Sequence, residues 1–299
     1  MNMPKILSCG EVLWDLFPER ARFGGASANF ACHTAILGGQ VSMLSAVGKD
    51  ARGDQALSIL KGFDIDTSLI QRVAGTPTGS VGIRLDVTGK PTFEIHSPSA
   101  WDCIAWENEL DSRVARVDAI YFGTLGQRSE LSRATIQQAI QLAKSHKILR
   151  VLDVNLRKPF YDAELIHDSI SQTSVLKLSE EELVEVAAAC DVEFAANPET
   201  TLRQLLTRFK LDLVVMTRGA EGAILVSPTE SVVQPGIPTI VRDTVGAGDS
   251  FTAAIVIGLL RGDPLAAIAR TACEIAAAVC MLDGAVPEVP ISPLPESYL

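Results

Sequence analysis

Short runs of valine, isoleucine and leucine alternate with longer segments of helical pattern, and this alternation limits the fold more than any other feature. The apolar runs include "DAIYFG", "RVLDVN", "SVLKLS" and "DLVVMT", and the segments between them include "RATIQQAIQLAKSH" and "PETTLRQLLTRF". Continuous apolar runs are typical of strands that are buried on both faces of a parallel sheet. The sequence therefore predicts a three-layer α/β/α core around a mostly parallel sheet.

Residues 78–97, "TGSVGIRLDVTGKPTFEIHS", depart from this pattern because apolar and polar residues alternate on both sides of the turn-rich "TGKP". Alternation is typical of a strand with one exposed face, so we expect an antiparallel hairpin here. Such a hairpin is a candidate lid over a site, although a plain edge hairpin has the same pattern. No repeat or long linker is visible, so we expect a single domain over residues 1–299, with a β lid formed by residues 11–24 and 76–102.

Charge and cysteine content exclude several classes of protein. The formal net charge is −10 and no run of lysine or arginine is present, which argues against a nucleic-acid partner. The 6 cysteines form no C-x-x-C pair and the 4 histidines lack metal-ligand spacing, so zinc is not expected. The first residues contain no apolar signal region and no apolar run could span a bilayer, which predicts a cytoplasmic protein without a membrane partner.

The stretch "DTVGAGDS" combines a glycine loop with a carboxylate at the start of an apolar segment. Glycines let backbone N–H groups approach a ligand closely, and the free N–H groups of a helix N-terminus attract anions. Gly246, Ala247 and Gly248 are therefore candidates for stabilising a phosphoryl group. Asp249 could accept the proton of a hydroxyl that attacks this group, and the apolar helix expected over about residues 250–260 would be buried. The alternative is that Asp249 only caps the helix.

Two better-known glycine loops do not fit this stretch. A Walker A loop requires G-x-x-x-x-G-K-[ST], and no lysine follows these glycines. A dinucleotide-binding loop requires G-x-G-x-x-G in the first βα unit, whereas Phe251 occupies the third glycine position and the motif lies near the carboxyl end. A dehydrogenase is therefore not expected.

Together with "GGASANFA" at residues 24–31, the stretch "DTVGAGDSF" resembles the two signature motifs of the ribokinase-like (PfkB) carbohydrate kinases, in the family's order and at about its spacing. Other stretches are similar to the fructokinase branch, namely "GEVLWDLFP", "VGKDARGD", "AWD", "YFGTLGQRS", "DVNLRKPFY", "LKLSEEEL" and "MTRGAEGA". The resemblance covers nearly the whole chain. It implies a ribokinase-like fold, with ATP and Mg²⁺ as cofactors and a small-molecule sugar as the second substrate.

The resemblance implies a sugar site built from two amino-terminal elements. Asp15 lies in the apolar strand "VLWDLF" and would bond sugar hydroxyls, because a carboxylate in such a strand needs a polar partner. Gly24 and Gly25 would permit close approach of the backbone, and Asn29 offers both a donor and an acceptor. By themselves, these residues would indicate only a loop and a helix start.

The stretch "DVNLR" follows an apolar strand and is expected to lie at the same site. Asn155 and Arg157 would lie just beyond the carboxyl end of the sheet, where open α/β proteins bind their ligands. Arg157 could contact a phosphate or a polar substrate group, although an ordinary surface arginine has the same pattern.

For the nucleotide, the resemblance implies contacts with Thr217, Gly219 and Gly222 in "TRGAEG" and with Lys177 in "LKLSEEEL". Residues 273–285 would flank the adenine, without a single contact that the sequence specifies. Taken alone, "TRGAEG" indicates only a turn after an apolar strand.

The resemblance also implies two sites for cations. Glu182 matches the acid of the family motif N-x-x-E and would organise Mg²⁺ through water, whereas Ser179 replaces the usual asparagine. Asp243 and Val245 match positions that border a monovalent-cation site in some relatives, and K⁺ is the ion expected there.

These residues predict an ATP-dependent kinase that phosphorylates a primary hydroxyl, with fructose to fructose 6-phosphate as the first choice and Asp249 as general base. One alternative is a 2-keto-3-deoxygluconate kinase, for which Arg84, Arg128 and Arg157 are candidate partners of the substrate carboxylate. Another is a catalytically silent binding module, although the intact "GAGD" argues against it. The unpaired edge of the lid would also allow a homodimer through the lid.

Overall fold

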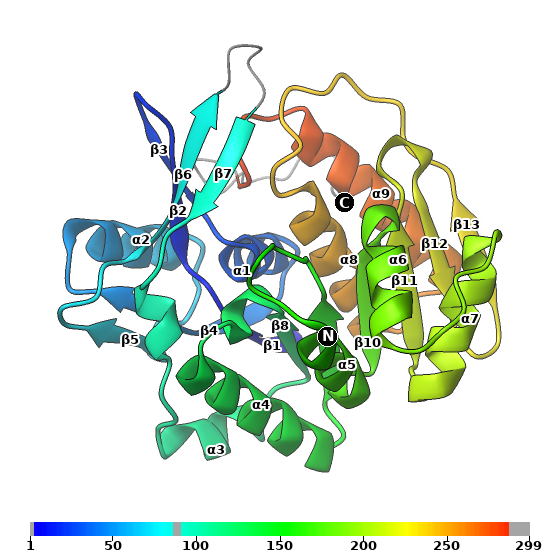
Figure 1. Cartoon of the computed structure of the whole chain (residues 1–299), viewed down its shortest axis with the longest axis horizontal. Helices are drawn as coiled ribbons and strands as arrows, with labels where there is room; N and C mark the ends of the chain where they lie inside the picture. Colours follow the sequence, from blue (N-terminus) through cyan, green and yellow to red (C-terminus); the bar gives the residue numbers. More distant parts are fainter. Residues whose placement is uncertain (1–2, 86–90, 287–299) are drawn as a thin grey trace.

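The computed structural model describes residues 3–85 and 91–286, in which two β-sheets organise the chain (Figure 1). The strands of the larger sheet are β1 (Lys5–Cys9), β4 (Gln40–Gly48), β5 (Ile70–Val73), β8 (Ala119–Gly123), β9 (Leu149–Asp153), β10 (Val175–Ser179), β11 (Leu213–Thr217), β12 (Ala223–Val226) and β13 (Ser231–Gln234). Their order across the sheet is β13-β12-β11-β10-β9-β8-β1-β4-β5.

The strands from β5 to β11 in this order are parallel, and β12 and β13 extend the sheet antiparallel. The apolar runs of the sequence therefore form the predicted mostly parallel sheet. Because parallel strands all end at one edge, the segments after β1, β8, β9, β10 and β11 meet on the same side of the molecule.

Helices cover both faces of this sheet. They are α1 (Ala26–Ile36), α2 (Ala51–Gly62), α3 (Glu109–Val114), α4 (Glu130–Ser145), α5 (Ala163–Gln172), α6 (Glu180–Ala189), α7 (Pro198–Phe209), α8 (Ala247–Arg261) and α9 (Leu265–Cys280), with short 3₁₀ turns at Ala100–Cys103, Leu125–Gln127 and Gly219–Glu221. No helix in the described ranges is both long and apolar enough to cross a membrane.

Side chains alternate between the two faces of each strand, and this alternation divides the core. In β8, Ile120 and Phe122 belong to the cluster that contains residues of α4, α5, α6 and α7. Ala119 and Tyr121 belong instead to the cluster formed with α8 and α9. Residues of α1 and α2 complete that second layer with β4. The predicted three-layer fold is therefore confirmed.

A second sheet has four strands, β2 (Leu13–Leu16), β3 (Ala21–Gly24), β6 (Gly79–Leu85) and β7 (Pro91–Ile95), in the order β3-β2-β6-β7. β6 and β7 pair antiparallel, as expected for the hairpin, while most of its predicted "TGKP" turn lies outside the described residues. All four strands fall within the ranges 11–24 and 76–102. Figure 1 shows this sheet on the same side of the molecule as the gold segment that leads into α8. Its action as a lid stays a prediction.

Candidate active site

The glycine loop lies at the amino end of α8. Gly246 precedes the helix with a φ of 81°, a left-handed conformation that favours glycine. A Cβ at this position would lie 2.3 Å from the carbonyl oxygen of Ala285, so the close approach of the two segments also requires glycine. The helix begins at Ala247, earlier than the predicted start near residue 250, because the glycine turn leads directly into it. Asp249 is consequently part of the first helical turn.

The backbone N–H groups of this helix end are only partly engaged. Ala247 N–H donates to the carbonyl of Thr244 at 3.3 Å. Within the residues that the structure describes, the N–H groups of Gly248 and Asp249 have no acceptor. Unpaired N–H groups at the positive end of a helix dipole attract an anion. The loop therefore has the arrangement of a phosphate cradle.

A hydrogen bond between Asn29 and Asp249 joins two motifs that are far apart in the sequence. Nδ2 of Asn29, in α1, donates to Oδ2 of Asp249 at 2.8 Å. Burial raises the pKa of Asp249 to about 7, and the bond from Asn29 acts in the opposite direction. A carboxylate with this pKa can accept a proton near neutral pH. The buried Oδ1 of Asn29 has no partner in the described structure, so it can accept a hydrogen bond from a ligand hydroxyl.

Asp15 lies in the smaller sheet, as the sequence predicts. It is half-buried on β2, which pairs with both β3 and β6, so it is not on an edge strand. Burial raises its pKa to about 6, the carboxylate of Asp243 adds to the rise, and Arg22 opposes it. A Cβ at Gly24 would lie 3.1 Å from Oδ2 of Asp15, so this glycine keeps the carboxylate uncovered.

Glu11 is a buried carboxylate that the sequence analysis missed. It is 2% exposed, and burial raises its pKa. Oε1 accepts the N–H of Ala26 at 2.9 Å, and Oε2 accepts the hydroxyl of Ser27 at 3.3 Å. Gly25 precedes α1 with a φ of 106° and has no side chain to cap it, so Glu11 caps the helix from the end of β1. The sequence feature that could have identified Glu11 is its position as an acidic residue two positions after the apolar strand β1.

Lys177 and Asp153 form a buried ion pair beside the glycine loop. Nζ of Lys177 lies 2.9 Å from Oδ2 of Asp153, and the two side chains are 9% and 2% exposed. Burial alone would lower the pKa of Lys177, but the carboxylates of Asp153 and Glu182 raise it above its usual value. A Cβ at Gly248 would lie 3.3 Å from Nζ, which places the ammonium group next to the loop. The sequence analysis did not identify Asp153 as a site residue, although it begins the stretch "DVNLR" that contains Asn155.

Glu182 connects two chain segments at the start of α6. Its Oε2 accepts the N–H of Ser179 at 2.8 Å, and its Oε1 accepts the N–H of Leu156 at 2.7 Å. Ser179 and Glu182 form a capping box, which explains a serine at this position. Among the described residues, no group of three or more His, Cys, Asp or Glu side chains could hold a metal ion. The role of Glu182 toward Mg²⁺ through water stays a prediction.

Asn155 and Arg157 follow β9 as expected. Asn155 has a φ of 39°, in the left-handed region that asparagine tolerates. Arg157 is exposed, and its Nη1 donates to the preceding carbonyl at 3.1 Å. The structure therefore places both residues beyond the end of the sheet without joining either of them to Asp249.

The arginines considered for a carboxylate substrate differ in availability. Arg128 is 5% exposed, and its Nε and Nη2 donate to the carboxylate of Asp102 at 2.7 and 2.8 Å. It already has a carboxylate partner inside the protein. The side chain of Arg84 lies outside the described part, so Arg157 is the exposed candidate that can be placed.

Thr217, Gly219 and Gly222 lie in the tight connection between β11 and β12. Thr217 ends β11 and is half-buried, and the two glycines have φ values of 52° and 90°. A Cβ at Gly222 would lie 2.1 Å from the carbonyl oxygen of Gln234. Gly222 is therefore required by backbone packing, and the nucleotide contacts of all three residues stay a prediction.

Asp243 does not present a free carboxylate. Its Oδ2 pairs with Nη1 of Arg22 at 2.8 Å, and its Oδ1 accepts the N–H of Val245 at 3.1 Å. A guanidinium group therefore holds the carboxylate of Asp243, and the monovalent-cation site expected at Asp243 and Val245 stays a prediction.

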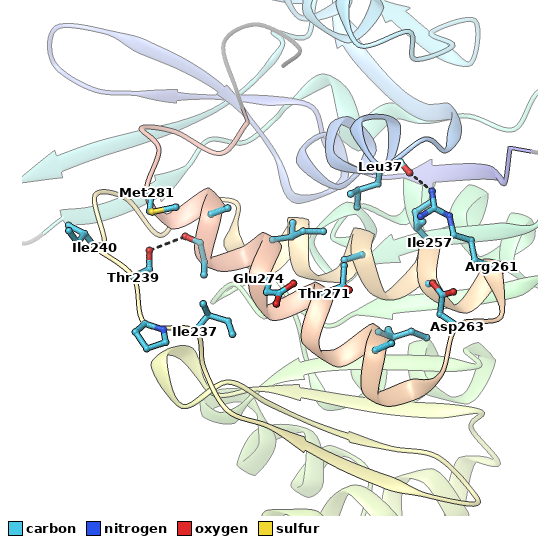
Figure 2. A pocket seen from close by; sticks show the side chains of 18 residues that line it. Leu37, Ile237, Thr239, Ile240, Ile257, Arg261, Asp263, Thr271, Glu274 and Met281 are labelled. Atoms are coloured by element: carbon cyan, nitrogen blue, oxygen red, sulfur yellow. Dashed lines mark hydrogen bonds between the residues drawn. The ribbon is translucent and has the colours of Figure 1, made fainter. Parts of the chain in front are cut away.

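A cavity of about 720 Å³ lies apart from these residues, against α8 and α9 (Figure 2). Residues 237–240 line it at one end with Met281, and Leu37 lies near Arg261, which donates to its carbonyl at 2.8 Å. Part of the stretch expected to flank the adenine, including Glu274, faces this cavity. None of the lining residues belongs to the glycine loop, so the cavity does not define the reaction centre.

Comparison with known proteins agrees with this arrangement. The family described as pfkB family carbohydrate kinase matches residues 18–291. The chain therefore belongs to the pfkB family of carbohydrate kinases, and it is a phosphotransferase that acts on a sugar hydroxyl.

Two relatives and one solved structure illustrate the range of this similarity. Fructokinase of Salmonella typhimurium is 27% identical over 265 residues, which cover 85% of this chain and 84% of that protein. Aminoimidazole riboside kinase of Salmonella typhimurium (strain LT2) is 24% identical over 271 residues, which cover 87% and 82%. Fructokinase from Xylella fastidiosa, solved with bound ATP, superposes with a TM-score of 0.81 at 22% identity and covers 94% of this chain and 93% of that one.

Proposed function

We propose that this kinase transfers the γ-phosphoryl group of ATP to a primary hydroxyl of a sugar, and that fructose, converted to fructose 6-phosphate, is its substrate. The observation that carries the proposal is the 2.8 Å bond from Asn29 to Asp249. It places the residue of the sugar motif against the carboxylate of the glycine loop. A hydroxyl bound at Asn29 would therefore lie next to a base and next to free backbone N–H groups.

In the proposed step, Asp249 accepts the proton of the sugar hydroxyl while the hydroxyl oxygen forms its bond to the γ-phosphorus. The bond from that phosphorus to the β–γ bridging oxygen breaks, and ADP leaves with its electron pair. Gly246, Ala247 and Gly248 stabilise the charge on the transferring group through the end of α8. The raised pKa of Asp249 suits this role, because the base must both take up and release a proton near neutral pH.

On the nucleotide side, the proposal uses the connection after β11 and the ammonium group beside the loop. Thr217, Gly219 and Gly222 would border the nucleotide, and Lys177 would face its phosphates from its position next to Gly248. Mg²⁺, when bound with ATP, would neutralise the phosphate charge. Protein carboxylates usually supply only one or two ligands to Mg²⁺, which suits a site where Glu182 acts through water.

On the sugar side, Asp15 and the unpaired Oδ1 of Asn29 would accept hydroxyl hydrogens. Asn155 and Arg157 would contact the substrate from the end of β9. Asp102 engages Nε and Nη2 of Arg128, whereas its buried Nη1 has no partner in the described structure and Arg157 is exposed, so 2-keto-3-deoxygluconate is kept as the second candidate substrate. The smaller sheet would close over the sugar and exclude water. A dimer through this sheet and a cytoplasmic location remain predictions.

A sugar panel tests the choice of substrate. Purified protein is supplied with ATP, Mg²⁺ and, in separate reactions, fructose, 2-keto-3-deoxygluconate or aminoimidazole riboside, and ADP release is measured. We expect the highest kcat/KM with fructose, because it is neutral and carries the hydroxyls that Asp15 and Asn29 can bind. A higher kcat/KM with 2-keto-3-deoxygluconate or the riboside would contradict the assignment to fructose while keeping the kinase.

The pH dependence of kcat/KM tests the role of Asp249. We expect activity to fall as the pH drops below about 7, by roughly tenfold per pH unit, because the protonated carboxyl group cannot act as a base. Replacing Asn29 by leucine removes a bond that lowers the pKa of Asp249, so the acid limb should move to higher pH. Thr34→Val is the control, because Thr34 is also buried on α1 and its hydroxyl has no hydrogen-bond partner among the described residues. An acid limb at the same pH in Asn29→Leu would argue against the assignment.

A further inference from the structure

Arg22 connects the smaller sheet to the segment that carries the glycine loop. It lies on β3, and its Nη1 is 2.8 Å from Oδ2 of Asp243, which precedes Gly246 in the chain. The two side chains are 21% and 19% exposed, so water only partly screens the pair. The ion pair therefore fixes the position of the loop relative to the sheet that holds Asp15.

The surroundings of Asp243 are already filled with hydrogen-bond donors. Besides Arg22, Oδ2 accepts the N–H of Gly284 at 3.1 Å, and Oδ1 accepts the N–H of Val245 at 3.1 Å. Nη2 of Arg22 lies 4.0 Å from a carboxylate oxygen of Asp283, so the guanidinium is shared by two acidic residues. The guanidinium group of Arg22 therefore supplies the positive charge that balances these carboxylates.

Within the described residues, two carbonyl oxygens near Asp243 are already engaged by hydrogen-bond donors. The carbonyl of Cys280 accepts the N–H groups of Arg242 at 2.8 Å and Asp243 at 3.3 Å. The carbonyl of Ala285, which lies against Gly246, is 2.8 Å from Nε2 of His33. Burial lowers the pKa of His33 to about 4, so its ring is neutral and donates this bond. With a guanidinium in the same place, a monovalent cation would meet engaged oxygens and a like charge.

Arg22 also stands opposite the proposed sugar carboxylate. It is the register partner of Asp15 in the antiparallel pair of β2 and β3. Arg22 is paired with Asp243 and lowers the pKa of Asp15, whereas burial and the carboxylate of Asp243 raise the pKa of Asp15. One guanidinium therefore lies between the residue expected to bind the sugar and the segment that leads to the phosphate cradle.

We propose that Arg22 is a positioning residue that takes the place of a bound monovalent cation and holds residues 243–246 so that the amino end of α8 faces the transferred phosphoryl group. This inference rests on the proposed kinase function. Its direct consequence is that the kinase does not depend on K⁺.

The test compares Arg22→Met and Arg22→Lys with Arg72→Met. Arg72 is a matched control because it pairs with Asp54 at 2.7 Å away from the loop. The kcat/KM for ATP is measured in KCl, NaCl or choline chloride at one ionic strength. Wild type and Arg72→Met should give equal values in all three salts. Arg22→Met should lose about tenfold or more in choline chloride and recover with added ethylguanidinium or K⁺, and Arg22→Lys should keep part of the activity.

Thermal unfolding provides a readout that does not require turnover. The unfolding midpoint of wild type should be the same in KCl and choline chloride, whereas that of Arg22→Met should rise in KCl or with ethylguanidinium. A K⁺-dependent wild type, full activity in Arg22→Met, or a loss that neither cation restores would overturn the inference. If no sugar is phosphorylated even by wild type, the proposed function fails, and the unfolding midpoints still decide whether Arg22 replaces a cation.

Discussion

Replacing Asp249 by asparagine is expected to lower kcat by about 10²–10⁴-fold, the usual contribution of a general base. The amide has nearly the same shape as the carboxylate, so the first turn of α8 and the contact with Asn29 can remain. Only the ability to accept the proton of the sugar hydroxyl is lost. Steady-state ADP release at saturating sugar and ATP measures the effect.

Sugar binding should survive this change, because Asp15, Gly24 and the unpaired Oδ1 of Asn29 are untouched. Isothermal titration with fructose would show this directly. Asp263→Asn is a suitable control, since Asp263 is an exposed acid just beyond the other end of α8. Turnover of Asp249→Asn within a few-fold of wild type would rule out Asp249 as the base.

Replacing Lys177 by methionine is expected to destabilise the fold by about 3–5 kcal/mol and to reduce turnover sharply. The carboxylate of Asp153, which is 2% exposed, loses the opposite charge of Lys177. Removing one partner of a buried ion pair typically lowers the free energy of unfolding by about 3–5 kcal/mol. The substitution also removes the positive charge beside Gly248. Urea unfolding measures the first effect, and kcat with fructose measures the second.

A double variant separates stability from catalysis. Asp153→Asn combined with Lys177→Met removes both charges, so most of the lost stability should return while kcat stays low. Lys158→Met, which breaks an exposed pair with Glu185, should change stability by less than about 1 kcal/mol. An unchanged urea midpoint in Lys177→Met would show that the pair is not needed for stability. Recovery of kcat in the double variant would show that Lys177 has no role at the phosphates.

The fold could be predicted because its signals are local. Runs such as "DLVVMT" are apolar throughout, and they became parallel strands with helices on both faces. The alternating residues of 78–97 became β6 and β7 for the same local reason. The chain passes from the larger sheet into the smaller one at Gly10, which has a φ of 143° and directly precedes the range 11–24 assigned to the lid.

The site could be predicted only as far as its motifs reached. Asn29 and Asp249 were selected from separate motifs, and the structure joins them directly. The partners Glu11, Asp153 and Arg22 were not selected, because their importance comes from contacts that only the folded chain creates. Arg22 is an ordinary residue of a short strand until it meets a carboxylate 221 positions later.

The K⁺ site expected at Asp243 and Val245 stays a prediction, and the contact of Arg22 with Asp243 is one that the motif could not reveal. Asp243 and Val245 match the motif positions that border a monovalent-cation site in some relatives, but a motif does not show which side chain lies opposite these residues. Ser179 is a similar case, since its departure from the family pattern is accommodated by a capping box with Glu182. In both places, long-range or helix-end contacts decide what a motif residue does.

The fructose reaction of the sugar panel tests the central claim most directly. ADP release is measured with fructose, without any sugar, and with fructose and Asp249→Asn, while ³¹P NMR identifies the product. We predict ADP release that depends on fructose, with one fructose 6-phosphate formed for each ADP and only weak hydrolysis of ATP without sugar. ADP release at the same rate with and without every sugar of the panel would contradict the account.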